Sequence, residues 1–560
     1  MVSAMSGSSD TFLGHPRSLF SLFFVEMWER FSYYGMRALL VFYMTKGFLA
    51  YDDARAYGVY GAYTALVYAT PFIGGILADR LLGQRRSVIL GGLLMAAGHL
   101  LMTVERPAAF YTALALLVCG NGFFKPNIST MVGGLYPAGS PRRDGGFTIF
   151  YMGINLGAAL SPLLCGYVGE RWGWHWGFGL ATLGMLAGLA TFVAPTIVAR
   201  SLIGLTAVAT FAGMVWMNAD NPPTLVVNLP VGIALLVGAA VAVAALAGGG
   251  LPSDLGHPPD PAGMHAPAFA GLPRLSRLHA VYLATAAAVP AIAVCIGLSS
   301  VAGVLLAVFG GLAVLSLVVD ACRSDRVERD RLFVVLVLMF FSMLFWAFFE
   351  QAGSSLSIFT DRHVDRTILG HDVPASLFQA ANPIYILAFG LVFTMLWGWL
   401  ARRRLDPGTP AKFAVGLAQM GLGFGAIWLG TRSASPQGLV SVGWLLLGYL
   451  LHTTGELCLS PVGLSMVTRL SPARMVSTVM GAWFLATAFS NYLAGMIAAL
   501  TGTGHGPASE PADAAAAVAG YGAVFGTIAV AALVAAAALL ALSPLLTRWM
   551  HGADAPATGH

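Results

Sequence analysis

The sequence predicts an all-α polytopic membrane protein, built as two six-helix bundles with extra linker helices between them. Its composition is 57% hydrophobic and 10% charged, with a mean hydropathy of +0.76, which lies outside the range of soluble proteins. Apolar runs recur along all 560 residues and are long enough to cross about 30 Å of hydrocarbon as helices. Local matches such as "GILADR" (75–80) and "GWLARR" (398–403) favour two related halves.

Sixteen apolar runs define the predicted spans. Six form a first half, residues 18–197, at 18–46, 54–79, 87–104, 108–136, 145–169 and 174–197. Four lie in a linker, residues 198–330, at 201–217, 224–247, 278–298 and 300–320, around a Pro- and Gly-rich loop at 249–277. Six form a second half, residues 331–547, at 331–360, 375–401, 411–431, 438–467, 475–501 and 518–547. We therefore expect two to four transmembrane helices in the linker: either the chain has sixteen spans, or some of these runs are re-entrant or one is miscounted. An even number of linker spans keeps the topology of the second half.

The distribution of Lys and Arg predicts the orientation in the cell inner membrane. With a cytoplasmic N-terminus and alternating spans, 20 of the 30 basic residues fall inside, 7 outside and 3 within spans. This bias places both termini in the cytoplasm. The first 17 residues are polar, so we expect no signal peptide. The net charge of +5 needs no nucleic-acid partner, and five scattered cysteines predict neither disulfides nor a metal site.

Seven ionisable side chains lie well inside predicted spans: Glu26, Glu29, Arg30, Arg37, Lys125, Glu350 and Glu456. Each costs about 2.5–3.5 kcal/mol in the middle of the membrane. Four acids and three bases nearly cancel, so we expect them to pair. Positions 26, 30, 33 and 37 recur at helical spacing and line one face, which we expect to point into the protein.

Helical rise places groups from five spans at one level, about 12–18 Å from the inner surface. They are Glu26 to Arg30, Lys125, Asn155, Glu456 and Trp483. This shared level predicts a binding site. Arg37 and Glu350 lie higher, each 19 residues into the first span of its half, and we expect their ion pair to close the outer part of a pathway.

Structural roles are the alternative for several of these residues. A buried Arg37–Glu350 pair can serve only to fix helix packing. Trp346 and Trp483 can be packing aromatics, and we expect His99 and His452 to be core histidines rather than proton carriers.

The stretch "EMWERFSYYG" (26–35) resembles the ExxERFxYYG signature of the proton-dependent oligopeptide transporters, a branch of the major facilitator superfamily. Further stretches resemble family motifs in the family's order: "GNGFFKPNIS", "FYMGINLGA", "FWAFFEQAGSS", "FQAANP", "GELCLSPVGLS" and "MGAWFLATAFSN". The resemblance covers residues 18–200 and 330–547. It implies the major facilitator fold, in which two bundles rock around a central cavity. Bacterial members usually carry two extra helices where this sequence has four apolar runs.

The resemblance also implies roles for individual residues. The peptide carboxylate would be received by Arg30, Arg37 and Lys125, and the amino group by Glu456 with Asn155 and Asn382. Ser460 would join the substrate site, Tyr33, Tyr34 and Tyr68 would line the cavity, and Trp346 and Trp483 would shape side-chain pockets. Glu26, Glu29, Arg30 and Glu350 would couple transport to protons, and Glu350 would pair with Arg37 as a gate.

We therefore expect a proton-coupled symporter that imports di- and tripeptides by alternating access, as a monomer in the lipid bilayer without a cofactor. The same fold could carry an amino acid, nitrate or a drug, although an anion alone would not need Glu456. A non-transporting peptide receptor is a further alternative. An intramembrane hydrolase using His452 and Glu456 is disfavoured, because the sequence has no HExxH, no GxSxG and no paired aspartates.

Overall fold

The computed structural model describes residues 11–137, 140, 142–252, 254–268, 275–472, 474–501 and 511–552. Within these residues the secondary structure consists of helices, joined by turns and loops, and three two-stranded sheets. Strands β1 (Thr11–Phe12) and β2 (His15–Pro16) are antiparallel, as are β4 (Thr367–Ile368) and β5 (His371–Asp372), whereas β3 (Val364–Asp365) and β6 (Val440–Ser441) are parallel. The predicted all-α class is confirmed.

Every predicted apolar run contains a long helix. Those of the first six runs are α1 (Ser18–Lys46), α2 (Asp53–Leu77), α3 (Gln84–Leu101), α4 (Pro107–Gly134), α5 (Arg143–Ser161) and α7 (Trp174–Val193). The linker runs hold α8 (Thr196–Met217), α9 (Pro222–Ala245), α11 (Arg277–Gly297) and α12 (Ser299–Arg323). The last six are α13 (Arg326–Phe349), α15 (Ala381–Arg402), α16 (Thr409–Arg432), α17 (Val442–Leu470), α18 (Val476–Ala499) and α19 (Pro511–Trp549). In the described part of the chain, fourteen helical segments are long and apolar enough to cross a membrane. Helices α1 and α3 are not among these fourteen, because they carry more charged and polar residues.

Short elements interrupt or extend several of the long helices. A π-helical turn η1 (Ala78–Leu82) extends α2, and another, η2 (Pro162–Gly166), leads from α5 into α6 (Tyr167–Trp172). Pro162 has no amide hydrogen to donate, which favours this break. The 3-10 turn η4 (Glu350–Gly353) separates α13 from α14 (Ser355–His363), so the predicted span 331–360 bends at its acidic residue. The remaining short elements are η3 (Leu246–Gly248), α10 (Pro261–His265) and η5 (Ala375–Ala380).

The chain divides into two compact units that interleave along the sequence. Unit 1 comprises Met1–Leu40, Thr70–Val294 and Thr367–Ile384, and unit 2 comprises Val41–Ala69, Cys295–Arg366 and Tyr385–His560. Helices α1 and α2 each contribute to both units. The predicted division at 18–197, 198–330 and 331–547 stays a prediction.

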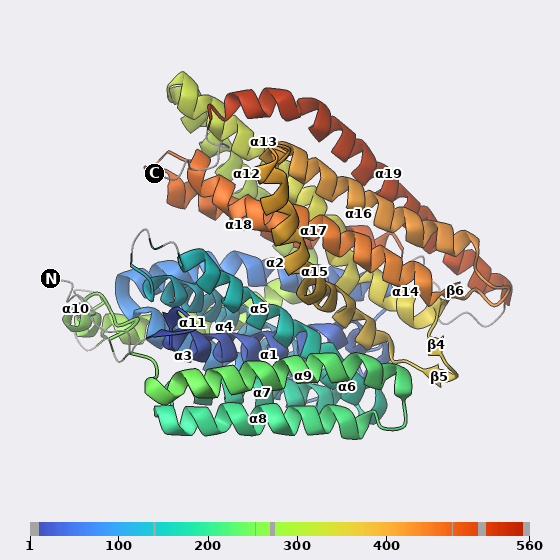
Figure 1. Ribbon diagram of the computed structural model, residues 1–560, viewed down its shortest axis with the longest axis horizontal. Coiled ribbons are helices and arrows are strands. Elements are labelled where there is room, and N and C mark those ends of the chain that lie inside the picture. The colour runs from blue at the N-terminus through green and yellow to red at the C-terminus, as the bar shows by residue number, and fades with distance from the viewer. Residues whose placement is uncertain are drawn as a thin grey trace. The chain divides into compact units, whose positions relative to one another are not determined.

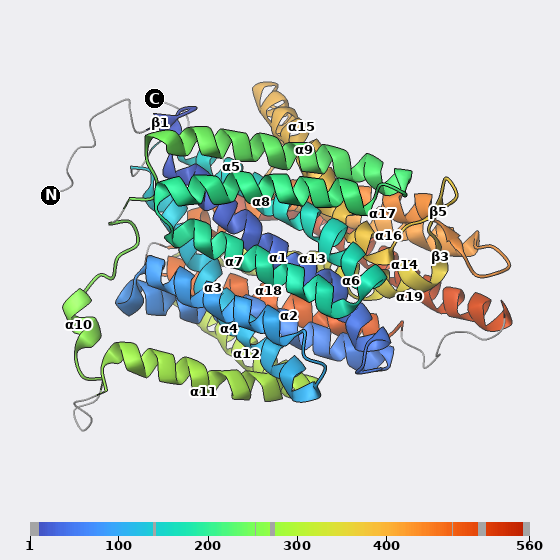
Figure 2. The same ribbon diagram turned by 90° about the horizontal axis from the view of Figure 1, so that it is seen from below.

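Within unit 1, α3 packs against α4 and α7, and the linker helices α8 and α9 lie side by side (Figures 1 and 2). The β1–β2 hairpin is attached to this unit by His15, whose Nδ1 lies 2.9 Å from the hydroxyl of Tyr136. Burial and the nearby Arg142 lower the pKa of His15, which favours its neutral form in this contact.

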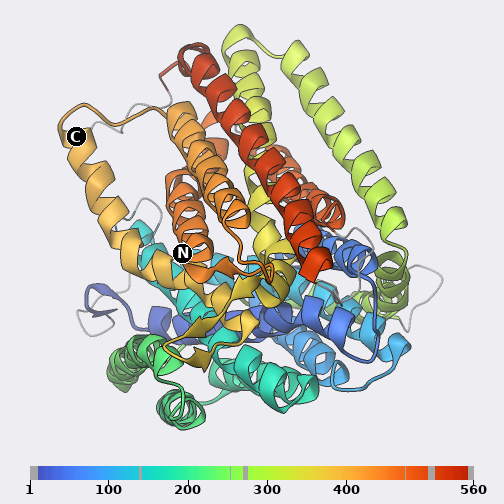
Figure 3. The same cartoon turned by 90° about the vertical axis from the view of Figure 1, so that its right-hand side faces the viewer.

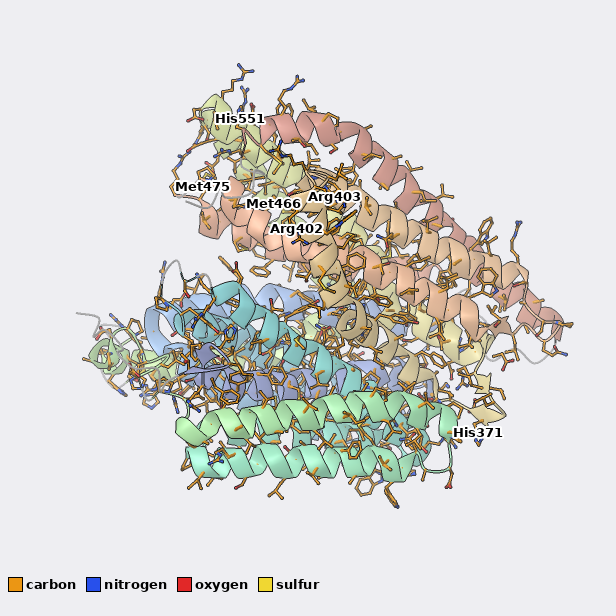
Figure 4. The ribbon with its side chains drawn as sticks, viewed as in Figure 1. His371, Arg402, Arg403, Met466, Met475 and His551 are labelled. Carbon is orange, nitrogen blue, oxygen red and sulfur yellow. The ribbon has the colours of Figure 1, made fainter. Side chains whose placement is uncertain are left out.

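Within unit 2, α16 lies between α17 and α19 and packs against both, and Figure 3 shows α16 beside α19. The segment after α19 is tied to the start of α13, since Nε2 of His551 lies 3.0 Å from Oδ2 of Asp330. His551 is labelled in Figure 4. Arg402 and Arg403 mark the end of α15 in the same view.

Candidate functional site

Three charged side chains form a buried cluster on α1. Nε of Arg30 donates to Oε1 of Glu26 at 2.9 Å and lies 2.6 Å from Oε2 of Glu29. The exposed fractions of Arg30, Glu26 and Glu29 are 3%, 2% and 0%. The guanidinium of Arg30 therefore pairs with two carboxylates, and all three side chains are buried. The predicted pairing of these residues is present in the structure.

Close helix packing encloses this cluster. A Cβ atom at Gly157 of α5 would collide with the carbonyl oxygen of Met27 and would lie 3.1 Å from Cβ of Arg30. On α7, a Cβ at Gly188 would lie 3.0 Å from Cβ of Trp28. Only glycine allows α5 and α7 to approach α1 this closely, and the approach keeps water from the charged face.

Two further predicted site residues lie in unit 1, Lys125 on α4 and Asn155 on α5. The positive charge of Lys125 acts electrostatically on Glu29, as the shared depth of these residues predicts. The Lys125 side chain is half-buried, whereas Asn155 is 4% exposed. Nδ2 of Asn155 donates to the carbonyl oxygen of Tyr151 at 3.0 Å, which holds the amide against its own helix.

Two tyrosines continue the charged face of α1 beyond the cluster. The guanidinium carbon of Arg30 lies 5.7 Å from the ring centre of Tyr33, and that of Arg37 lies 5.8 Å from the ring centre of Tyr34. The two rings meet edge to face with centres 5.3 Å apart. Cation–π contacts of this kind orient guanidinium groups without neutralising them.

Asn382 lies in unit 1, on the first turn of α15. The preceding segment is anchored to this unit: Nε2 of Gln379 donates to the carbonyl oxygen of Ala38 at 3.3 Å. The backbone amide of Ser376 donates to Oε1 of Glu170 at 2.7 Å. Asn382 therefore follows a segment held beside the Arg37 end of the face, in the unit that also holds Asn155.

Glu350 lies in unit 2, where α13 ends. The next residue, Gln351, is fully buried, and its Nε2 donates to the carbonyl oxygens of Ala347 and Ala494. Oγ of Ser355 donates to Oε1 of Gln351 at 2.6 Å. These bonds tie the break after α13 to α18. Arg37 belongs to unit 1, so the Arg37–Glu350 gate stays a prediction.

The other predicted site residues of unit 2 lie on helices that pack against one another. Glu456 of α17 is 7% exposed, and the Trp483 ring of α18 packs where α17 has Gly463. Trp346 makes edge-to-face contacts with Phe345 and Phe349. Tyr68 packs against the core cluster of Ala65, Leu306 and Ala488. Ser460 lies in α17, but its side chain is outside the described part.

The predicted core histidines are both buried. His452, one turn before Glu456, contacts Phe424 with ring centres 4.5 Å apart and ring planes tilted by 36°. His99 of α3 is fully buried. Among the described residues, no group of three or more His, Cys, Asp or Glu side chains is placed to hold a metal ion.

The sequence interpretation missed a set of ion pairs in unit 2, which we call the rim pairs. Nζ of Lys46 lies 2.5 Å from Oδ2 of Asp361, and Arg362 forms a bidentate pair with Asp53 at 2.8 and 2.9 Å. They join the end of α1, the start of α2 and α14. The sequence did contain a signal for the rim pairs: residues of opposite charge flank the predicted ends of three spans on one side of the membrane.

Comparisons with known proteins show the family to which the chain is related. A family model described as POT family matches residues 85–204 and 310–510. The uncharacterized transporter YclF of Bacillus subtilis is 35% identical over 494 residues, covering 87% of this chain and 89% of its own length. The peptide transporter YePEPT of Yersinia enterocolitica is 33% identical and covers 87% and 88%. A crystal structure of the peptide transporter POT in complex with sulfate superposes with a TM-score of 0.72 at 35% identity, covering 96% of this chain and 97% of its own.

Proposed function

This chain belongs to the POT family, and from that premise we propose that it is a proton-coupled symporter that imports di- and tripeptides by alternating access. The observation that carries the proposal is the α1 cluster, in which Glu26 and Glu29 share Arg30 while Lys125 acts on Glu29. Two carboxylates with one guanidinium leave an excess negative charge, and burial makes such an excess costly. The positive charge of Lys125 offsets it.

This charge balance links peptide binding to protonation. When the carboxylate of a peptide engages Lys125, that cation no longer compensates the acids, and a proton on Glu29 or Glu26 restores the balance. The amino group of the peptide then needs an acid of its own, which we assign to Glu456 with Asn155 and Asn382. The identity of a relative as a peptide transporter supports the same cargo.

The proton gradient suffices for accumulation. One unit of pH difference supplies about 1.4 kcal/mol per proton, and 100 mV of membrane potential supplies about 2.3 kcal/mol more. One proton per peptide would therefore concentrate the peptide several hundredfold. We place both termini in the cytoplasm of the cell that drives this uptake, and we expect the protein to act as a monomer.

The test is uptake of labelled dialanine into proteoliposomes under an imposed pH step. We expect accumulation that needs the pH step and that unlabelled di- and tripeptides inhibit, whereas free amino acids and tetrapeptides do not. Inhibition by an amino acid, nitrate or a drug in place of peptides would assign the site to that solute. Saturable dialanine binding without uptake would identify a receptor and contradict transport.

A further inference from the structure

A groove in unit 1 lies outside the predicted transport site. It has a volume of about 720 Å³, and its lining residues belong to α3, α4, α10 and the linker helix α11. Its walls are apolar, and include Leu90 and Leu93 of α3, Leu116 of α4, and Leu278 and Val289 of α11. The linker helix α11 thus forms one wall of an apolar groove, and the sequence did not indicate a role for that helix.

Two apolar clusters hold α11 in place beside the groove. Val281 packs with Leu82 and Phe123 at one level, and Val289 packs with Ala115 and Cys119 at a deeper level. The residues that face outward remain uncovered: Leu93 is 53% exposed and Tyr282 is 42% exposed. In a membrane these side chains face hydrocarbon, so the groove opens laterally to the lipid.

The groove has a basic end. Arg86, in the first turn of α3, and His265, the last residue of α10, both line it there. Nη1 of Arg86 lies 2.7 Å from the sulfur of Met264, which keeps the guanidinium beside α10 at the mouth. In the described part of the chain Arg86 forms no ion pair within 4.0 Å.

The length of the apolar part follows from helical rise. Eight residues separate Arg86 from Leu94 on α3 and eleven separate Leu278 from Val289 on α11, which corresponds to about 12–16 Å of groove. A cation at the helix ends and an apolar channel running inward match the two parts of a phospholipid, a phosphate headgroup and an acyl chain. Basic groups at this level favour an anionic headgroup over a zwitterionic one.

We propose that this groove binds an anionic phospholipid, with its phosphate at Arg86 and His265 and one acyl chain between α3 and α11. The bound lipid fills the groove between α11, α3 and α4. We therefore expect it to be part of the folded structure of unit 1. This proposal is independent of the transported solute, because it concerns residues that the transport mechanism does not use.

Native mass spectrometry of the full-length protein, with phosphatidylglycerol and phosphatidylcholine as probes, tests the headgroup. We expect preferential retention of phosphatidylglycerol, and a drop of about fivefold in its affinity for Arg86→Gln, since one basic group near the membrane surface contributes about 1 kcal/mol. The matched control is Arg80→Gln, an exposed arginine six residues earlier that does not line the groove. Equal affinities for both lipids, or the same loss in both variants, would overturn the proposal.

A second pair of variants tests the acyl channel. Ala286 lines the groove, whereas Ala287, the next residue on α11, is exposed and does not. We expect Ala286→Trp to lose phosphatidylglycerol and Ala287→Trp to retain it, with both proteins monodisperse and active in dialanine uptake. Glycerol phosphate should not displace the lipid, because it lacks the chain. Displacement by glycerol phosphate, by inorganic phosphate or by an uncharged detergent at equal concentration would contradict a phospholipid site.

Discussion

The α1 cluster and the rim pairs use the same chemistry in different surroundings. In the cluster, Glu26, Glu29 and Arg30 are at most 3% exposed, and acids outnumber bases. In the rim pairs, the side chain of Lys46 is 42% exposed and that of Arg362 is 27% exposed, and Asp53 and Asp361 balance them. Each rim pair holds one base and one acid and is partly open to water, with Arg366 a further base 4.0 Å from Asp361, whereas the cluster is dry and its acids outnumber its base.

This difference separates two functions of an ion pair. A neutral pair near water can open and close at low cost, because water replaces the lost partner. A dry cluster with one acid too many cannot lose a base without taking up a proton or another cation. On this comparison we expect the proposed proton linkage to depend on the cluster, and we expect the rim to form reversible helix contacts.

The largest effect is expected from Arg30→Ala, which leaves two carboxylates buried without their guanidinium. Breaking a buried pair in this way costs about 3–5 kcal/mol, so we expect uptake to be abolished and the midpoint of thermal unfolding to fall. Arg30→Lys keeps the charge but removes Nε, the atom that contacts both acids, and places a compact ammonium group instead. It should fold like the parent protein and transport poorly. Normal dialanine uptake by Arg30→Ala would remove the cluster from the mechanism.

Glu29→Gln sharpens the comparison, because it leaves Glu26 paired with Arg30 and removes the acid on which Lys125 acts. We expect accumulation driven by a pH step to fall more than tenfold, while counterflow of labelled against unlabelled peptide persists. Glu105→Gln, at an exposed position, is the control for loss of a carboxylate. Undiminished accumulation in both Glu29→Gln and Glu26→Gln would exclude these acids from coupling.

Much of this site could be predicted from the sequence. The charges in span 18–46 have no reason to lie in a membrane unless they pair, and helical spacing placed Glu26 and Arg30 on one face. The depth argument also brought Lys125 to the level of Glu29, where the structure has it.

Other features depend on tertiary contacts and carried no clear local signal. The π-helical turn at Pro162 and the 3-10 turn at Glu350 interrupt runs that hydropathy shows as continuous. Gln351 is bonded to Ala494, which is 143 residues away, so no periodicity could reveal its role. The rim pairs likewise join residues up to 315 positions apart, since Lys46 meets Asp361.

Reversing the charges of the Asp53–Arg362 pair tests whether the rim is a contact that must form. Asp53→Arg places two guanidinium groups together, and we expect uptake to fall several-fold with a modest loss of thermal stability. Adding Arg362→Asp restores the bidentate geometry with its polarity exchanged, so the double variant should recover most of the uptake. The coupling energy from the double-mutant cycle should lie between about 0.5 and 3 kcal/mol. Additive losses would show that the two residues act separately.

Lys46→Gln should have the smallest effect, because its side chain is the most exposed member of the rim pairs. Asp361 is 7% exposed, but it keeps Arg366 at 4.0 Å when Lys46 is replaced. An ion pair that is open to water on one side contributes about 0–1 kcal/mol, and salt screens it. At 1 M salt the screening length is about 3 Å, so the difference in thermal stability between Lys46→Gln and the parent protein should vanish there. The Arg30→Ala defect should persist in the same buffer, because salt ions do not enter a dry cluster. A salt-independent Lys46→Gln defect would mean that this pair is shielded from water, and the contrast between the rim and the cluster would then have to rest on charge balance alone.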